Sequence, residues 1–145
     1  MTESTLGNNS GNFSGYEPGS YTIEHQDNIL ASTVRGPLTP PILEQYQLDM
    51  RNACEKFHGK TWGALVTYYG GDLLTQDTEE TLLNIAKHRI RHGMVANATV
   101  ILESKHTDLQ QMQLKRIYQN CQLEFHVFTN TEIARNWLSQ YLAQQ

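Results

Sequence analysis

The sequence has little of what marks a secreted, membrane-spanning or disulfide-stabilised protein. No apolar run approaches the roughly 18 residues that a membrane-spanning helix needs, and the N-terminus lacks the basic start and apolar stretch of a secretory signal. Cysteine is scarce, with only Cys54 and Cys121 in 145 residues. Two cysteines in such a chain are expected to be buried thiols rather than a disulfide. These absences predict a soluble, cytoplasmic protein with no membrane span.

Excess positive charge and catalytic motifs are also absent. The 11 lysine and arginine residues are outnumbered by 15 acidic residues and are spread along the chain. We expect no nucleic-acid partner, because binding to phosphate backbones needs clustered basic residues. No serine lies in a G-x-S-x-G turn, Cys54 occupies an apolar helical position, and Gly70-Gly71 lacks the Walker and dinucleotide spacings. We therefore expect a non-enzymatic protein without catalytic residues or a cofactor.

Residues 1–19 have almost no apolar side chains. They are mainly Gly, Asn, Ser, Thr and Glu, and such a segment cannot bury enough surface to offset the entropy lost on ordering. The sequence predicts a flexible N-terminal arm over residues 1–19, either a plain disordered tail or a docking arm. A single domain is predicted over residues 20–145.

A β-hairpin is predicted at the start of this domain. Asp27-Asn28 separates two segments of β-type sequence, residues 21–26 and 29–35, and suits a two-residue turn with positive φ. The turn fixes which residues face each other on the apolar side: Tyr21 and Val34, Ile23 and Ser32, His25 and Leu30. The other side is mostly polar, so we expect only one side of the hairpin to be covered.

Four amphipathic helices alternate with strands in the rest of the domain. Each helix has a start signal: Thr39 with Pro40, Asp77 with Glu80, Thr107 with Gln110, and Thr129 with Glu132. Strands are predicted at residues 61–69, 98–103 and 123–128. The order β-β-α-β-α-β-α-β-α predicts an α/β fold with about five strands and about four helices. The sheet should be mostly parallel, with one N-terminal antiparallel hairpin.

This order of elements resembles the SpoIIAA-like fold of the STAS domains, which occur in sulfate transporters and anti-sigma factor antagonists. More narrowly, the chain resembles small stand-alone bacterial proteins of that fold. The matching parts are the hairpin, the proline-rich residues 37–41, the strand at 64–69 and the final unit over residues 125–142. The resemblance rests on element order and apolar patterning, and it implies a regulatory, protein-binding role.

In anti-sigma factor antagonists, an Asp-Ser pair after the third strand carries the phosphorylated serine that switches partner binding. The corresponding residues 69–78 contain no serine. By position in the fold, the candidate binding residues are Gly70, Gly71, Asp72, Thr75 and Thr78. Thr75 and Thr78 carry the only aliphatic hydroxyl groups there that could accept a phosphate, and nearby acidic residues would repel it. The alternative is that both threonines serve local capping and turn formation.

A basic cluster lies at the end of the second predicted helix. It comprises Lys87, His88, Arg89, Arg91 and His92. His88 and His92 have the i, i+4 spacing of zinc ligands, but the neighbouring arginines repel a cation and no third ligand is close in sequence, so we expect no metal site. The cluster is either a contact patch for an anionic partner or a solvated helix end that complements the helix dipole.

Three functions are compatible with these features. The first is a non-enzymatic regulatory or protein-interaction module that uses residues 70–92. The second is a carrier or sensor of a small apolar ligand or lipid, as in CRAL-TRIO domains of related fold, with Tyr46, Met50 and Phe57 lining a pocket or simply filling the core. The third is assembly as a homodimer through the polar hairpin face or through Glu124, His126 and Phe128.

Overall fold

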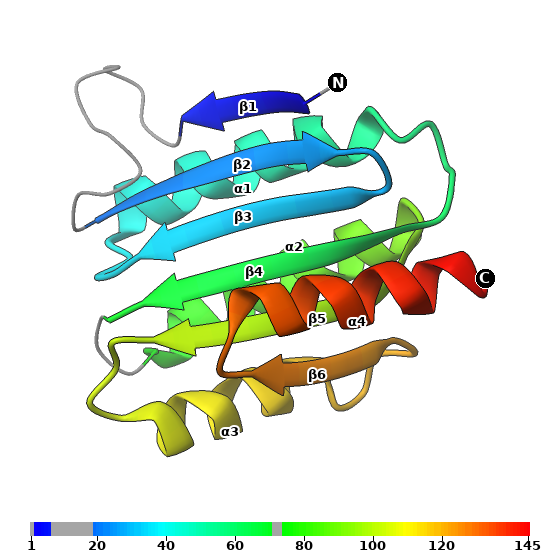
Figure 1. Cartoon of the computed structure of the whole chain (residues 1–145). Helices are drawn as coiled ribbons and strands as arrows, with labels where there is room; N and C mark the ends of the chain where they lie inside the picture. Colours follow the sequence, from blue (N-terminus) through cyan, green and yellow to red (C-terminus); the bar gives the residue numbers. More distant parts are fainter. Residues whose placement is uncertain (1, 7–18, 71–73) are drawn as a thin grey trace.

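A six-stranded sheet with helices on both faces forms the fold in a computed structural model that describes residues 2–6, 19–70 and 74–145 (Figure 1). The strands are β1 (Thr2–Leu6), β2 (Ser20–Gln26), β3 (Ile29–Arg35), β4 (Trp62–Tyr69), β5 (Met94–Leu102) and β6 (Glu124–Phe128). The helices are α1 (Pro40–Glu55), α2 (Gln76–Arg91), α3 (Thr107–Tyr118) and α4 (Thr131–Ala143). From β2 onward the predicted order and the α/β class are confirmed. None of the helices in the described ranges is both long and apolar enough to cross a membrane.

The strands lie in the sheet in the order in which they follow one another along the chain. β2 and β3 pair antiparallel, whereas β3, β4, β5 and β6 are parallel to one another. The hairpin register is the predicted one, with Tyr21 opposite Val34 and His25 opposite Leu30. Asp27 in the turn has a φ of 57°, as a two-residue turn of this kind requires.

β1 is a strand that the sequence did not predict. It pairs antiparallel with β2, from Thr2 opposite Gln26 to Leu6 opposite Thr22. The prediction of a flexible arm is therefore wrong for Thr2–Leu6, and residues 7–18 lie outside the described residues. An edge strand is held by backbone hydrogen bonds to its neighbour. Composition, which indicated the arm, does not report on such bonds.

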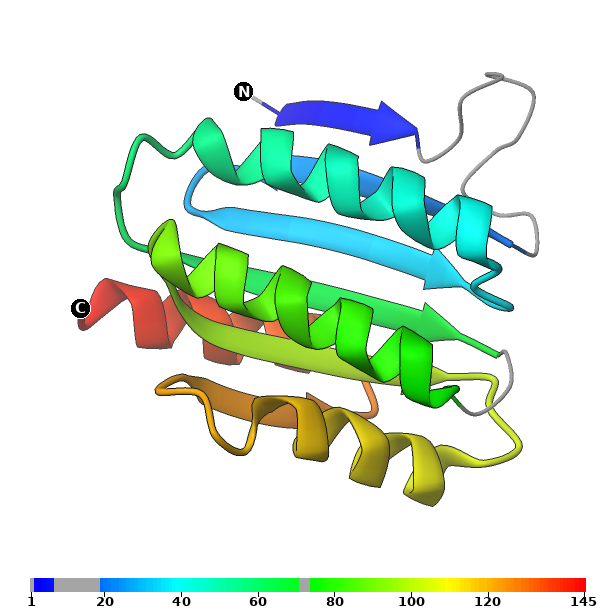
Figure 2. The same cartoon turned by 180° about the vertical axis from the view of Figure 1, so that it is seen from behind.

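Three helices cover one face of the sheet and the fourth covers the other. α1, α2 and α3 lie together on one side, and α4 lies across β4 and β5 on the opposite side (Figures 1 and 2). Right-handed crossovers that advance one strand at a time put all their helices on the same face. α4 follows the last strand and is free to turn back over the other face. Gly63 permits its close approach, because a Cβ there would lie 2.6 Å from Leu138 Cδ1.

Three of the helix starts differ from the predicted caps by one or two residues. At α3 the cap position is His106 rather than Thr107. α1 starts at Pro40 after Thr39, as predicted. α2 is capped by Thr75 rather than Asp77. α4 is capped by Asn130, whose side chain accepts a hydrogen bond from the backbone N–H of Ile133 at 3.0 Å, rather than by the preceding threonine. Capping residues occur at several nearby positions at the starts of α2 and α4, and only the backbone path selects one of them.

Candidate functional site

A pocket of about 170 Å³ opens at the carboxyl ends of β3 and β4. We call it the edge pocket. Residues from both strand ends, from the start of α2 and from α3 line it: Val34, Gly36, Pro37, Leu38, Tyr68, Tyr69, Gly70, Leu74, Thr75, Thr78 and Gln110. Ligands of parallel α/β sheets bind beyond the carboxyl ends of the strands. Gly70, Thr75 and Thr78 of the predicted site thus lie together, whereas Gly71 and Asp72 lie outside the described residues.

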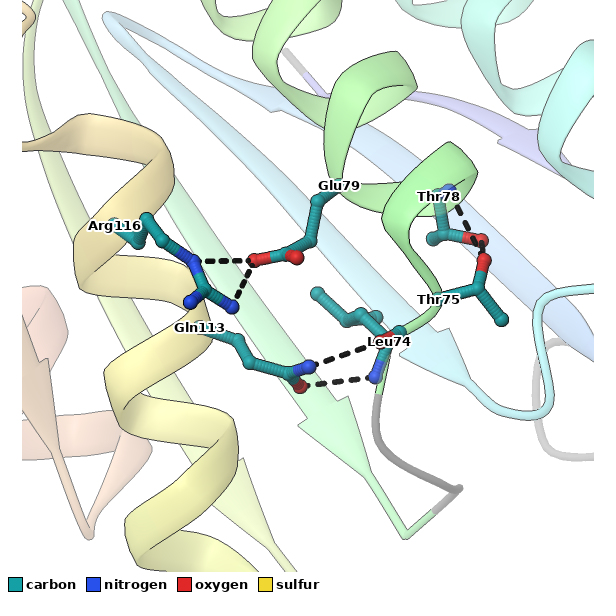
Figure 3. Close-up of polar contacts among 6 residues, drawn as sticks. All are labelled: Leu74, Thr75, Thr78, Glu79, Gln113 and Arg116. Carbon is teal, nitrogen blue, oxygen red and sulfur yellow. Dashed lines mark hydrogen bonds and ion pairs between the residues drawn. The ribbon is translucent and has the colours of Figure 1, made fainter.

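The two candidate threonines form the N-terminal cap of α2. Thr75 Oγ1 accepts a hydrogen bond from the backbone N–H of Thr78 at 3.1 Å and donates one to Thr78 Oγ1 at 2.9 Å (Figure 3). Thr75 is exposed, whereas Thr78 is 9% exposed. The capping interpretation is therefore confirmed for both residues. Of the two hydroxyl groups, only that of Thr75 is placed where a modifying enzyme could reach it.

Replacing Thr75 with alanine should lower the free energy of unfolding by about 1 kcal/mol, because the cap of α2 is lost. Thr75→Ser should keep most of the stability, because serine offers the same acceptor oxygen. Urea denaturation followed by circular dichroism measures both changes. Equal stability of the alanine variant and the wild type would contradict the capping role.

Two glutamines of α3 hold the backbone on either side of the loop between β4 and α2. The Gln113 side chain accepts from the Leu74 N–H and donates to the Leu74 carbonyl, both at 2.9 Å (Figure 3). Gln110 Nε2 donates to the Gly70 carbonyl at 3.4 Å. Arg116 adds an ion pair to α2 through Glu79 Oε1, with distances of 3.0 Å from Nε and 2.9 Å from Nη2. Sequence reasoning missed this arrangement, because the residues that meet are about forty positions apart.

Gln113→Ala should lower the free energy of unfolding by about 1–3 kcal/mol, since two hydrogen bonds of about 0.5–1.5 kcal/mol each are lost. The larger effect should be local, with faster hydrogen exchange at the Leu74 amide than in the wild type. Gln111→Ala on the same helix is the matched control and should leave this exchange rate unchanged. Equal exchange rates in both variants would show that the Gln113 side chain does not hold the loop.

A second hollow, which we call the interhelical groove, continues from the edge pocket between α1 and α2. Its volume is about 470 Å³, and it shares Leu38, Thr75 and Thr78 with the edge pocket. Its walls also carry two acidic side chains, Glu44 of α1 and Asp77 of α2. The two hollows therefore adjoin. The smaller one is lined by apolar side chains with hydroxyl and amide groups, and the larger one carries two acidic side chains.

Arg89 is not part of the predicted basic patch. It is 4% exposed and lies on the buried face of α2, where its Nη2 donates a hydrogen bond to the Tyr118 hydroxyl at 2.6 Å. Its Nε and Nη1 have no hydrogen-bond partner within the described part of the chain. The patch prediction is wrong for Arg89, because this residue follows Leu82 and Ile85 at helical spacing on the face that packs against the sheet.

Aromatic hydroxyls rather than carboxylates surround this guanidinium. Burial lowers the pKa of Arg89, whereas Tyr118, Tyr46 and Tyr68 raise it overall, because their ionised forms at high pH attract the guanidinium. At neutral pH these tyrosines are uncharged, so the side chain stays charged without a compensating negative charge among them. Tyr118 also accepts a hydrogen bond from Asn97 Nδ2 at 3.1 Å. Nearby, burial raises the pKa of the Cys54 thiol to about 11. Cys54 is therefore an unreactive core residue, as expected from its apolar position.

The remaining members of the basic cluster lie at the surface. Lys87 and Arg91 are exposed, while His88 and His92 are half-buried with ring centroids 4.3 Å apart. Burial is the main cause that lowers the pKa of His88, and the neighbouring His92, Arg51 and Arg91 lower it further. Within the described ranges, no group of three or more His, Cys, Asp or Glu side chains is arranged to hold a metal ion.

The lowered pKa of His88 predicts a loss of stability in mild acid. In the unfolded chain His88 takes up a proton near pH 6.5, whereas in the folded protein it does so only at a lower pH. The stability should be fully present above about pH 6.5 and should fall as the pH drops below this value, because the unfolded state then binds more protons than the folded state. His88→Gln should flatten the dependence of unfolding free energy on pH below about pH 6.5. An unchanged slope in urea titrations across that range would contradict this assignment.

The three residues considered for an apolar ligand site fill the core instead. Tyr46, Met50 and Phe57 are 3%, 1% and 8% exposed. The Phe57 ring stacks on Trp62 with centroids 4.6 Å apart, and Tyr46 meets the edge of Tyr21 at 4.9 Å. Their packing positions α1 on the sheet, and none of the three lines the edge pocket or the interhelical groove.

Comparisons with known proteins place no further constraint on this site. No family model, no curated protein and no solved structure matches the chain.

Proposed function

We propose that this chain is a non-enzymatic protein-interaction module with a regulatory role, and that its partner binds the edge pocket and the interhelical groove. The observation that carries the proposal is that the two hollows adjoin and share the lining residues Leu38, Thr75 and Thr78. The resemblance to the SpoIIAA-like fold supports the same surface, since anti-sigma factor antagonists bind their partners after the corresponding strand.

The chemistry of the lining favours recognition of a partner. The edge pocket offers hydroxyl, amide and backbone groups beside apolar side chains, among them Thr75, Gln110 and Leu74. No acid, histidine or cysteine is among its described lining residues, so the pocket lacks an acid–base pair of the usual kind. Glu44 and Asp77 give the groove negative charge. The partner that fits this surface has an apolar side chain for the pocket and basic residues along the groove.

Affinity capture from native lysate with matched variants tests this proposal. The charge-reversed variant Glu44→Lys with Asp77→Lys alters exposed groove residues. The control variant, Glu55→Lys with Glu132→Lys, makes the same change of charge at exposed positions outside the groove. We expect a partner that the wild type and the control recover and that the groove variant recovers at least about tenfold less, a difference of about 1.4 kcal/mol.

Two results would contradict the proposal: capture of no specific partner, or equal recovery by the groove variant and the control. The captured wild-type protein also allows mass spectrometry of Thr75. A phosphate there would identify the residue through which partner binding is regulated, because it adds negative charge at the mouth of an already acidic groove.

A further inference from the structure

β6 ends the sheet, and no strand in the described ranges pairs with its outer edge (Figure 1). The strand has five residues and runs parallel to β5. Its side chains remain partly open to solvent on both faces, unlike those of β4 and β5, which are largely buried. An open strand edge offers unpaired N–H and C=O groups to another strand.

Apolar and aromatic groups continue to this edge on both faces. On the side of α3, Phe125 stacks on Tyr118 with centroids 4.5 Å apart and is only partly buried. On the side of α4, Trp137 meets His126 at 4.8 Å and Phe128 at 5.6 Å. The apolar side chains that pack on both faces of the sheet are therefore only partly covered at this edge.

The sequence of β6 is complementary to itself when two copies run antiparallel. With Phe125 opposite Phe125 of the partner subunit, Glu124 lies opposite His126 of the partner subunit, and the reverse pair forms on the other side of the two-fold axis. Leu123 then lies opposite Val127 of the partner subunit. Directly opposed side chains of antiparallel strands have Cβ atoms about 4.5–5.5 Å apart. Glutamate thus meets histidine and two apolar pairs form in a single register, in which Leu123 directly precedes β6 and Phe128 lies opposite Gln122 of the partner subunit.

We propose that a second copy of this chain pairs with β6 in this register, so that two sheets join into one continuous sheet across a two-fold axis. The interface is isologous, because the same strand contributes to both sides. Within one chain, Glu124 Oε1 and His126 Nε2 lie 2.8 Å apart at the surface, with side chains about half exposed. Pairing in the proposed register would exchange this contact within one chain for two equivalent contacts between the chains. The sequence of β1 at the opposite end of the sheet, Thr-Glu-Ser-Thr-Leu, offers no reciprocal pair of glutamate and histidine.

Sedimentation velocity over a wide range of protein concentration, combined with a charge exchange, tests the proposal. The wild type should show a reversible dimer. His126→Glu places glutamate opposite glutamate in the proposed register and should weaken the dimer at least tenfold. Adding Glu124→Lys to this variant places lysine opposite glutamate and should restore the dimer. Thermal unfolding of each variant checks that the monomer fold is retained.

A wild type that stays monomeric at up to about 1 mM, a concentration that would detect millimolar affinity, overturns the proposal. A dimer that His126→Glu leaves unchanged also overturns it, because the copies would then meet through another face. Hydrogen exchange of the wild type provides a measurement that needs no variant. Amides of β6 should become more protected as the concentration rises, and unchanged protection in a sample that dimerises would exclude β6 from the interface.

Discussion

Replacing Arg89 with methionine should raise the free energy of unfolding by about 1–4 kcal/mol, the size of gain seen when complete buried ion pairs are replaced by apolar residues of similar volume. Arg89 is 4% exposed, and among the described residues its guanidinium has one hydrogen bond, to Tyr118, and no carboxylate partner. Methionine retains much of the volume and adapts its shape to the site. Tyr118 keeps the hydrogen bond from Asn97 in the variant. Urea denaturation of both proteins measures the difference.

Two companion variants separate charge from packing at this position. Arg89→Ala should lose stability despite removing the charge, because it leaves a cavity. Arg89→Lys keeps the charge but cannot reproduce the planar guanidinium, so it should lose stability as well. If Arg89→Met were less stable than the wild type by more than about 2 kcal/mol, in the range that unpaired buried groups cost, the guanidinium would be stabilising the fold.

Gly93→Ala should lower the free energy of unfolding by more than about 4 kcal/mol, a loss seen only when a specific structural requirement is broken. Gly93 has a φ of +105°, and a Cβ there would lie 2.3 Å from the backbone oxygen of Lys60. The clash is with backbone and cannot be relieved by a change of rotamer. The same short segment also anchors β4, because the Trp62 N–H donates to the Gly93 carbonyl at 3.1 Å and Trp62 Nε1 donates to the His92 carbonyl at 2.8 Å.

Gly59→Ala is the matched control for this prediction. Gly59 also has a left-handed backbone, with a φ of +77°, but nothing lies within 4 Å of the point that a Cβ would occupy. Only the conformational cost of about 1–2 kcal/mol should appear there. Thermal and urea unfolding compare the two variants. Equal losses at the two positions would show that backbone conformation, and not the contact with Lys60, sets the requirement for glycine.

Features determined by nearby residues could be predicted from the sequence. Asp27-Asn28 fixes the hairpin turn, and the turn fixes the pairing of Tyr21 with Val34. Alternating strands and helices determined the α/β class and the parallel sheet. Gly70, Thr75 and Thr78 lie in one pocket because the start of a helix follows the end of a strand by only a few residues. In each case a short stretch of chain contains all the information.

Features that depend on distant residues were missed. The contact between Gln113 and Leu74 depends on where α3 lies relative to α2, and glutamine on a helix surface gives no sign of it. Arg89 lies at a helical position that points into the core, but its charge favoured a surface assignment. β1 forms because the edge of β2 can accept another strand, and the polar sequence of β1 does not indicate this pairing. Spatial neighbours, rather than local propensity, decide each of these three.

The consecutive strand order has a consequence for how the chain reaches its native state. Every strand pairs with the strand immediately before it, so the sheet can grow by adding one strand and one helix at a time. Such contacts have short sequence separations, which favours rapid folding, and nascent chains can begin this growth from the N-terminal side. α4 packs on β4 and β5, which precede it. Of the described elements α4 is the last to be synthesised, so we expect the apolar residues beneath it to be exposed, and prone to aggregation, on the growing chain.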